Sequence, residues 1–188
     1  MFDTYFFHIP ELDLNDKQRS ALYKRYLIFK ATNKNLNRNT YQGSFFKTFH
    51  TDIDVLKDVY SNKILKQIEE LCKGYPNDRF ERSSSYEFLS TEGKVELHRD
   101  PVRLAVLTIP IRDVEHNNLE FWNEETTKIV KKLDYDNKTY IMRTRPPHSV
   151  LTASKSRVFW QGSIYIQEFD NIMKEYKQGN LFKSGLIT

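Results

Sequence analysis

The second half of the chain alternates apolar and polar residues with a period of two, in short runs separated by turn-forming segments. Such alternation is typical of β-strands that bury one face. Runs of this kind occupy residues 84–89, 94–98, 104–111, 119–123, 127–133, 139–143, 148–151 and 157–169. Gly, Asn, Asp and Ser in the connections suit tight turns and Greek-key links. The pattern therefore predicts a mainly β fold with flanking helices, a closed β-sandwich of the jelly-roll kind.

The first half is predicted to supply helices that pack on this sheet. Asn15 followed by Gln18 resembles a capping box, which opens a helix that continues to about residue 30. A second helical segment begins near Asp52, restarts at Ser61 and ends at Gly74. The other segments are predicted strands at residues 4–9 and 41–48, the latter bent at Gly43, and a loop at residues 32–39. An amphipathic helix buries its stripe against its own sheet or against a partner, and we favour the sheet; the oligomeric state stays open.

The length of 188 residues predicts one domain with a substantial core. We expect residues 1–79 to form a helical support, residues 80–170 the β core and residues 171–188 a C-terminal extension. No run approaches the roughly 20 apolar residues of a membrane span, and the N-terminus lacks the layout of a secretion signal. We therefore expect a cytoplasmic protein without membrane contact, in which the lone Cys72 packs in the core.

The charge of the chain is a weak guide to its partners. The 29 basic and 25 acidic residues give a net charge of +4, spread along the sequence. Mild basicity favours an anionic partner, such as nucleic acid or a small molecule with a carboxylate, yet many enzymes have the same balance. A nucleic-acid substrate is therefore possible but not favoured.

Two histidines and one aspartate are arranged as a mononuclear non-haem iron(II) site requires. His98 and Asp100 lie two residues apart at the end of a predicted strand, so both are expected to face the interior while Arg99 faces away. His148 lies several strands later, after two prolines that hold the chain extended. Two imidazoles and one carboxylate on one face of the metal leave the opposite face open for oxygen and a co-substrate.

Arg157 begins the last predicted strand and is expected to enter the same interior. A buried guanidinium needs a carboxylate partner, and its planar fork binds a carboxylate through two hydrogen bonds. A dicarboxylic co-substrate would supply that partner.

These residues, together with the stretches LEFWN and PPHSV, make the region 84–169 resemble a known family. The family is the iron(II)- and 2-oxoglutarate-dependent oxygenases, and the likeness is to its prolyl-hydroxylase-like branch. The fold that the resemblance implies is a double-stranded β-helix, the cupin-like form of the jelly roll. The resemblance implies that His98, Asp100 and His148 ligate iron(II). It also implies that Arg157 binds the distal carboxylate of 2-oxoglutarate. The implied reaction is hydroxylation of a substrate by molecular oxygen, with release of succinate and carbon dioxide.

One position departs from the pattern of the family. Many members carry Ser or Thr two residues after the arginine, where this chain has Phe159. Another hydroxyl is then expected to help bind the co-substrate, and Tyr86 and Thr108 are the candidates.

The resemblance also separates the possible reactions. Halogenating members replace the acidic ligand with a small residue, so Asp100 favours hydroxylation. The run after Arg157 contains no second arginine, which disfavours the nucleic-acid dealkylating members. A small molecule or a protein side chain is therefore the favoured substrate, and a nucleotide stays open as a less favoured one. The alternative is a non-catalytic or differently metallated cupin-type module that serves in binding or interaction. Such a module has no need of a buried arginine for a dicarboxylate.

Overall fold

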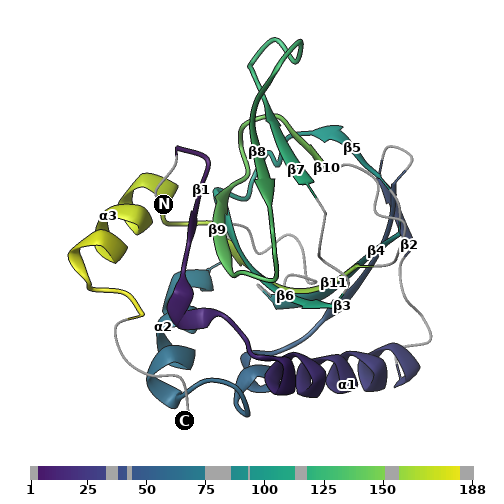
Figure 1. Ribbon diagram of the computed structural model, residues 1–188, viewed down its shortest axis with the longest axis vertical. Helices are drawn as coiled ribbons and strands as arrows, with labels where there is room; N and C mark the ends of the chain where they lie inside the picture. Colours follow the sequence, from purple (N-terminus) through teal and green to yellow (C-terminus); the bar gives the residue numbers. More distant parts are fainter. Residues whose placement is uncertain are drawn as a thin grey trace.

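Two antiparallel β-sheets that face each other form the centre of the computed structural model, which describes residues 4–32, 38–41, 44–74, 86–92, 94–112, 118–150 and 157–182 (Figure 1). The larger sheet has the strand order β1-β9-β6-β11-β4-β3-β2, and the smaller sheet has the order β5-β10-β7-β8. The predicted jelly roll is confirmed. Its eight core strands are β4 (Tyr86–Glu92), β5 (Val95–His98), β6 (Ala105–Arg112), β7 (Asn118–Trp122), β8 (Ile129–Asp134), β9 (Tyr140–Arg143), β10 (His148–Val150) and β11 (Arg157–Ile164).

The first half of the chain also contributes strands to the larger sheet. Strand β1 (Phe6–His8) pairs with β9, and β3 (Ser44–His50) pairs with β4. Strand β2 (Arg38–Tyr41) pairs with β3, so the predicted single bent strand is a hairpin whose first strand begins within the predicted loop. The bend at Gly43 and residues 33–37 of the loop lie outside the described residues. The N-terminal half is therefore part of the sheet as well as its helical cover.

Two helices cover the outer face of the larger sheet, as Figure 1 shows: α1 (Asp16–Thr32) and α2 (Asn62–Cys72). The predicted capping box opens α1, because Asn15 Oδ1 accepts from Gln18 N at 2.9 Å and Gln18 Oε1 accepts from Asn15 N at 3.0 Å. Ser61 caps α2 by accepting a hydrogen bond from the backbone N–H of Ile64. The segment predicted after Asp52 is a short 3₁₀ helix, Ile53–Leu56, and another precedes α1 at Pro10–Leu12. Buried Cys72 lies in the core between α2 and the sheet, as predicted.

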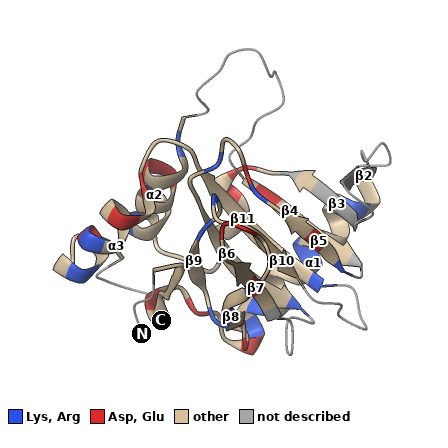
Figure 2. Cartoon of the chain, turned by 90° about the horizontal axis from the view of Figure 1, so that it is seen from above, with Lys and Arg blue, Asp and Glu red and all other residues tan. Residues whose placement is uncertain are grey.

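The C-terminal part differs from the prediction, because the strand expected to reach residue 169 ends at Ile164. Ile164 is opposite Ala105, the first residue of β6, so the ladder has no partner strand beyond it. Helix α3 (Phe169–Gln178) follows, buries Phe169 and Ile172 at helical spacing, and ends at Gly179 with φ of 79°. In the cartoon of Figure 2, α3 is coloured for both basic and acidic residues, in keeping with the nearly balanced charge of the chain.

The larger sheet has an apolar core on each of its two faces, because successive side chains of a strand point to opposite faces. On β11, Val158, Trp160 and Ile164 face the helices. Phe159 belongs instead to the cluster between the two sheets, with Val106 and Phe121. Among the described helices, none is both long and apolar enough to cross a membrane.

Candidate metal centre

A cavity of about 680 Å³ opens between the two sheets. Apolar side chains form part of its lining, among them Val106, Leu119 and Phe159. His98, Asp100 and His148 line it as well, as does Arg157. The structure therefore brings the predicted metal ligands and the predicted carboxylate-binding arginine to one space.

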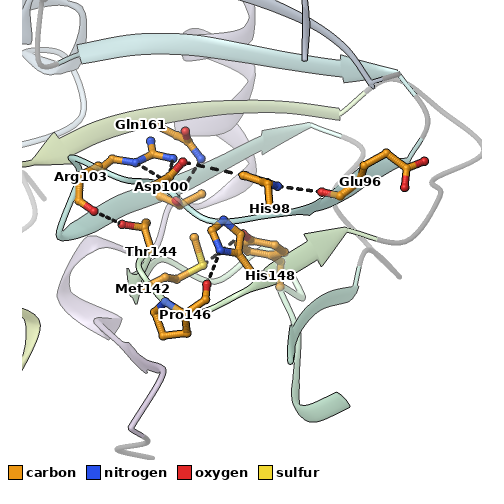
Figure 3. Close-up of polar contacts among 11 residues, drawn as sticks. Glu96, His98, Asp100, Arg103, Met142, Thr144, Pro146, His148 and Gln161 are labelled. Carbon is orange, nitrogen blue, oxygen red and sulfur yellow. Dashed lines mark hydrogen bonds and ion pairs between the residues drawn. The ribbon is translucent and has the colours of Figure 1, made fainter. Parts of the chain in front are cut away.

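His98, Asp100 and His148 converge on one point of the wall (Figure 3). His98 and His148 are opposite each other in the β5–β10 ladder, and their ring centroids are 4.3 Å apart. One potential ligand atom from each of the three residues lies within 4.8 Å of the others. His98 Nε2 is 4.0 Å from Asp100 Oδ1. A single cation can contact all three side chains from this position.

Backbone carbonyls orient both imidazole rings. His98 Nδ1 is 2.7 Å from the carbonyl oxygen of Glu96, and His148 Nδ1 is 2.9 Å from that of Pro146 (Figure 3). A carbonyl only accepts, so each Nδ1 carries the proton, and the lone pair available to a metal ion lies at Nε2 of each ring. The chain bends at Arg145 and Pro146, where the sequence predicted an extended segment, and Pro146 holds the ring of His148 through its carbonyl oxygen.

The ionisation states of the site suit a metal ion. Burial lowers the pKa of His148 to about 4, helped by the neighbouring His98. Burial raises the pKa of Asp100, yet the charge of Arg103 and the two histidines outweigh it, so the pKa lies below the ordinary range. His148 is therefore neutral and Asp100 ionised at neutral pH, the forms in which these groups ligate metals.

Arg157 is 2% exposed, and its Nε donates to Thr91 Oγ1 at 2.9 Å. Within the described parts of the chain, no acidic side chain forms an ion pair with it. Burial lowers the pKa of Arg157, and the nearby hydroxyl of Tyr135 opposes that shift. A buried cation that lines a cavity, and that forms no ion pair with an acidic side chain of the described residues, is suited to an anionic ligand.

The structure places the two predicted hydroxyls differently. Thr108 faces the space between the sheets and accepts a hydrogen bond from Gln161 Nε2 at 3.3 Å, but the cavity does not reach it. Tyr86 is on the opposite face of the sheet, where its ring stacks on Trp160 with centroids 5.5 Å apart. The structure therefore does not bring Tyr86 to the cavity.

The hydroxyls that the sequence reasoning missed are those of Thr91 and Tyr135, which line the cavity together with Arg157. Thr91 is directly opposite Arg157 in the β4–β11 ladder. The alternation of faces along the strand YEFLSTE could have shown that Tyr86 and Thr91 cannot both face the cavity, because they point to opposite faces of the sheet. Nothing in the sequence indicated the strand register that pairs Thr91 with Arg157.

Arg99 also differs from its prediction. Arg99 was predicted to face away from the site because side chains alternate between the two faces of a strand. Strand β5 ends at His98, so this alternation does not extend to Arg99. Asp100 is held instead by a hydrogen bond from its backbone N–H to the carbonyl oxygen of Thr144 at 3.2 Å. Arg99 lines the cavity and forms an ion pair with Glu124 at 2.7 Å. It is 43% exposed, which places it at the rim.

No protein-family model and no curated protein sequence matches this chain. Solved structures do match. A prolyl-4-hydroxylase from Pseudomonas putida has a TM-score of 0.53 at 13% identity, over 87% of this chain and 94% of that one. AviO1 from Streptomyces viridochromogenes has a TM-score of 0.51 at 14% identity, over 86% and 89% of the two chains. SnoN, a non-heme alpha-ketoglutarate-dependent epimerase from nogalamycin biosynthesis, has a TM-score of 0.54 at 11% identity, over 85% and 76%. At these identities the likeness is one of fold, and the chain has the fold of the iron(II)- and 2-oxoglutarate-dependent oxygenases.

Proposed function

We propose that this protein is an iron(II)- and 2-oxoglutarate-dependent oxygenase that hydroxylates a small molecule or a protein side chain. One observation carries the proposal: two imidazoles and a carboxylate converge within 4.8 Å on the wall of a cavity that also contains a buried arginine. Either feature alone has an ordinary structural explanation. Together they supply a metal site and a carboxylate site in one enclosed space.

The donor set fits iron(II). His98 and His148 offer nitrogen and Asp100 offers oxygen, which is the ligand set of mononuclear iron(II) oxygenases. When bound, iron(II) and 2-oxoglutarate supply the oxidation: oxygen converts 2-oxoglutarate to succinate and carbon dioxide, and the substrate gains a hydroxyl group. The side chains of the protein position these reactants and keep water away from them.

We assign the distal carboxylate of 2-oxoglutarate to Arg157, Thr91 and Tyr135. The guanidinium offers its fork, and the two hydroxyls add hydrogen bonds that replace the Ser or Thr expected at Phe159. Phe159 itself contributes an apolar side chain to the lining of the cavity, which helps to exclude water from it.

The size of the cavity supports a substrate that enters it as a single small group. A volume of about 680 Å³ lies within the range of sites for small ligands, and it has to hold the co-substrate as well. Arg99 and Arg143 line this cavity and each pairs with an exposed acid, Glu124 and Asp170 respectively. Such exposed pairs are weak, so they can separate to let a substrate in.

An anaerobic titration with iron(II) and then 2-oxoglutarate tests the proposal. The expected result is a visible charge-transfer band that saturates with one 2-oxoglutarate per protein, followed by succinate when oxygen is admitted. Arg157→Ala is expected to lose the band at 2-oxoglutarate concentrations that saturate the wild type. Arg145→Ala removes an exposed arginine near His148 and serves as the matched control, with an unchanged titration. A wild-type protein that gives neither the band nor succinate would refute the proposal and favour a cupin-type binding module.

A further inference from the structure

The side chain of Arg103 folds back onto the predicted metal ligand Asp100. Arg103 Nε and Nη2 donate to the same oxygen, Asp100 Oδ2, at 2.9 and 2.6 Å (Figure 3). The two side chains are only 21% and 20% exposed. A charge-assisted pair of this kind, made by two donors and partly withdrawn from water, is stronger than an ordinary surface ion pair.

This arrangement distinguishes the two oxygens of the carboxylate. Oδ2 accepts both hydrogen bonds from the guanidinium, whereas Oδ1 faces His98 Nε2 at 4.0 Å. Oδ1 is thus the oxygen that lies near His98, and Oδ2 is the oxygen that Arg103 binds. A metal ion that His98 and His148 bind would meet one oxygen of Asp100.

The backbone holds Arg103 in place for this contact. Its carbonyl oxygen accepts a hydrogen bond from Thr144 Oγ1 at 2.5 Å. The next residue, Leu104, donates its backbone N–H to the carbonyl oxygen of Ile164 at 2.9 Å. Asp100 N–H is bonded to the carbonyl oxygen of Thr144 at 3.2 Å. Thr144 therefore anchors both ends of the segment that contains the pair, so the guanidinium and the carboxylate keep a fixed relation.

We propose that Arg103 is a positioning residue that restricts Asp100 to ligation through one oxygen, Oδ1; this inference rests on the proposed iron(II) site. A carboxylate that binds through both oxygens occupies one more position on the metal. Ligation through one oxygen leaves open the positions that the co-substrate and oxygen need. Arg103 thus acts through Asp100, in the way that outer partners of metal ligands set their orientation.

The test is the affinity of the purified protein for metal, measured without turnover. Arg103→Met keeps much of the length and volume of the side chain and removes its donors. We expect the dissociation constants of iron(II), measured anaerobically by calorimetry, and of cobalt(II) to rise about 10–100-fold, the usual effect of losing an outer partner. The visible spectrum of the cobalt(II) protein, which reports the ligand geometry, is expected to change. Arg145→Met, at an exposed site, is the matched control and should leave both readouts as in the wild type.

Two further variants separate positioning from a role in folding. Arg103→Lys keeps the charge but has no fork, so it should restore only part of the affinity, and it carries the test if Arg103→Met does not fold. In an Asp100→Ala background, Arg103→Met should cost no further metal affinity, because its effect passes through the carboxylate.

The outcomes also distinguish the two proposals. A wild-type protein that binds iron(II) or cobalt(II) through the triad, together with folded Arg103→Met of equal affinity and unchanged spectrum, would overturn the inference about Arg103 and leave the proposed function standing. A wild-type protein whose metal binding is unaffected by Asp100→Ala and by exchange of the histidines would overturn the proposed function itself.

Discussion

Replacement of Arg157 by methionine is expected to stabilise the ligand-free protein and to remove its response to 2-oxoglutarate. Arg157 is 2% exposed, and its only hydrogen bond to another described side chain runs from Nε to Thr91 Oγ1. In the absence of a ligand, the burial of this cation works against folding, as the lowered pKa of Arg157 indicates. Methionine has a similar length and no charge.

The magnitude follows from two opposing contributions. Exchange of buried charge for apolar side chains of similar volume stabilises proteins by about 1–4 kcal/mol in favourable cases. Loss of the hydrogen bond to Thr91 costs about 1 kcal/mol. Together they leave a net gain of up to about 3 kcal/mol. The middle of that range, about 1–2 kcal/mol, raises Tm by roughly 2–8 °C in a chain of this size.

The assay is thermal unfolding of the wild type and Arg157→Met, each with and without 2-oxoglutarate, in the presence of redox-inactive manganese(II). A ligand at 100 times its Kd stabilises the folded protein by about 2.7 kcal/mol. The wild type should therefore be the less stable protein without 2-oxoglutarate and the more stable one with it. Arg157→Lys retains the buried charge and is expected to show no gain in the ligand-free state.

The reasoning fails if the order of stabilities does not reverse. A less stable Arg157→Met without ligand would show that the guanidinium has a stabilising partner. A variant that still gains stability from 2-oxoglutarate, to the extent of the wild type, would show that the ligand binds elsewhere.

Three further predictions concern other parts of the molecule. The pKa of His148 is about 4 in the folded protein, against an ordinary value of 6.5. Between these two pH values the unfolded chain binds more protons than the folded protein. The metal-free protein should therefore lose up to about 3 kcal/mol of stability as the pH falls from 6.5 to 4. Urea unfolding at pH 7 and 4.5 measures the loss, and an equal loss in His148→Gln would contradict its assignment to this group. A Cβ at Gly162 would lie 2.7 Å from Cys72 Sγ, so Gly162→Ala should destabilise the folded protein by about 1–3 kcal/mol. The loss should be smaller in a Cys72→Ala background, where the sulfur is absent. If the two substitutions prove additive in this double-mutant cycle, the contact is excluded. Phe121 is fully buried, and its ring packs against those of Tyr5 and His148. Phe121→Ala should therefore lower the free energy of unfolding in urea by about 3–5 kcal/mol and also weaken metal binding. A loss below about 1 kcal/mol would argue against this packing.

The β core was predictable because its strands bury one face and expose the other, which leaves a period of two in the sequence. Helix α1 was predictable from the reciprocal hydrogen bonds that Asn15 and Gln18 make locally. Helix α3 was missed because the apolar run of β11 continues past Ile164, and only the end of its partner strand β6 stops the ladder there. The same limit applies to β2, which depends on pairing with β3.

At the site, the residue types along the chain set the kinds of chemistry available: two imidazoles, a carboxylate and an arginine near strand ends. Residue type and approximate strand position are local properties, so they can be read along the chain. Which groups meet is decided by register and by the loops between strands. Register places Thr91, and not Tyr86, beside Arg157. The hydrogen bonds of Thr144, from a segment distant in sequence, hold Asp100 against Arg103 beyond the end of β5. These contacts exist only in the tertiary structure, because each joins residues that no local pattern connects.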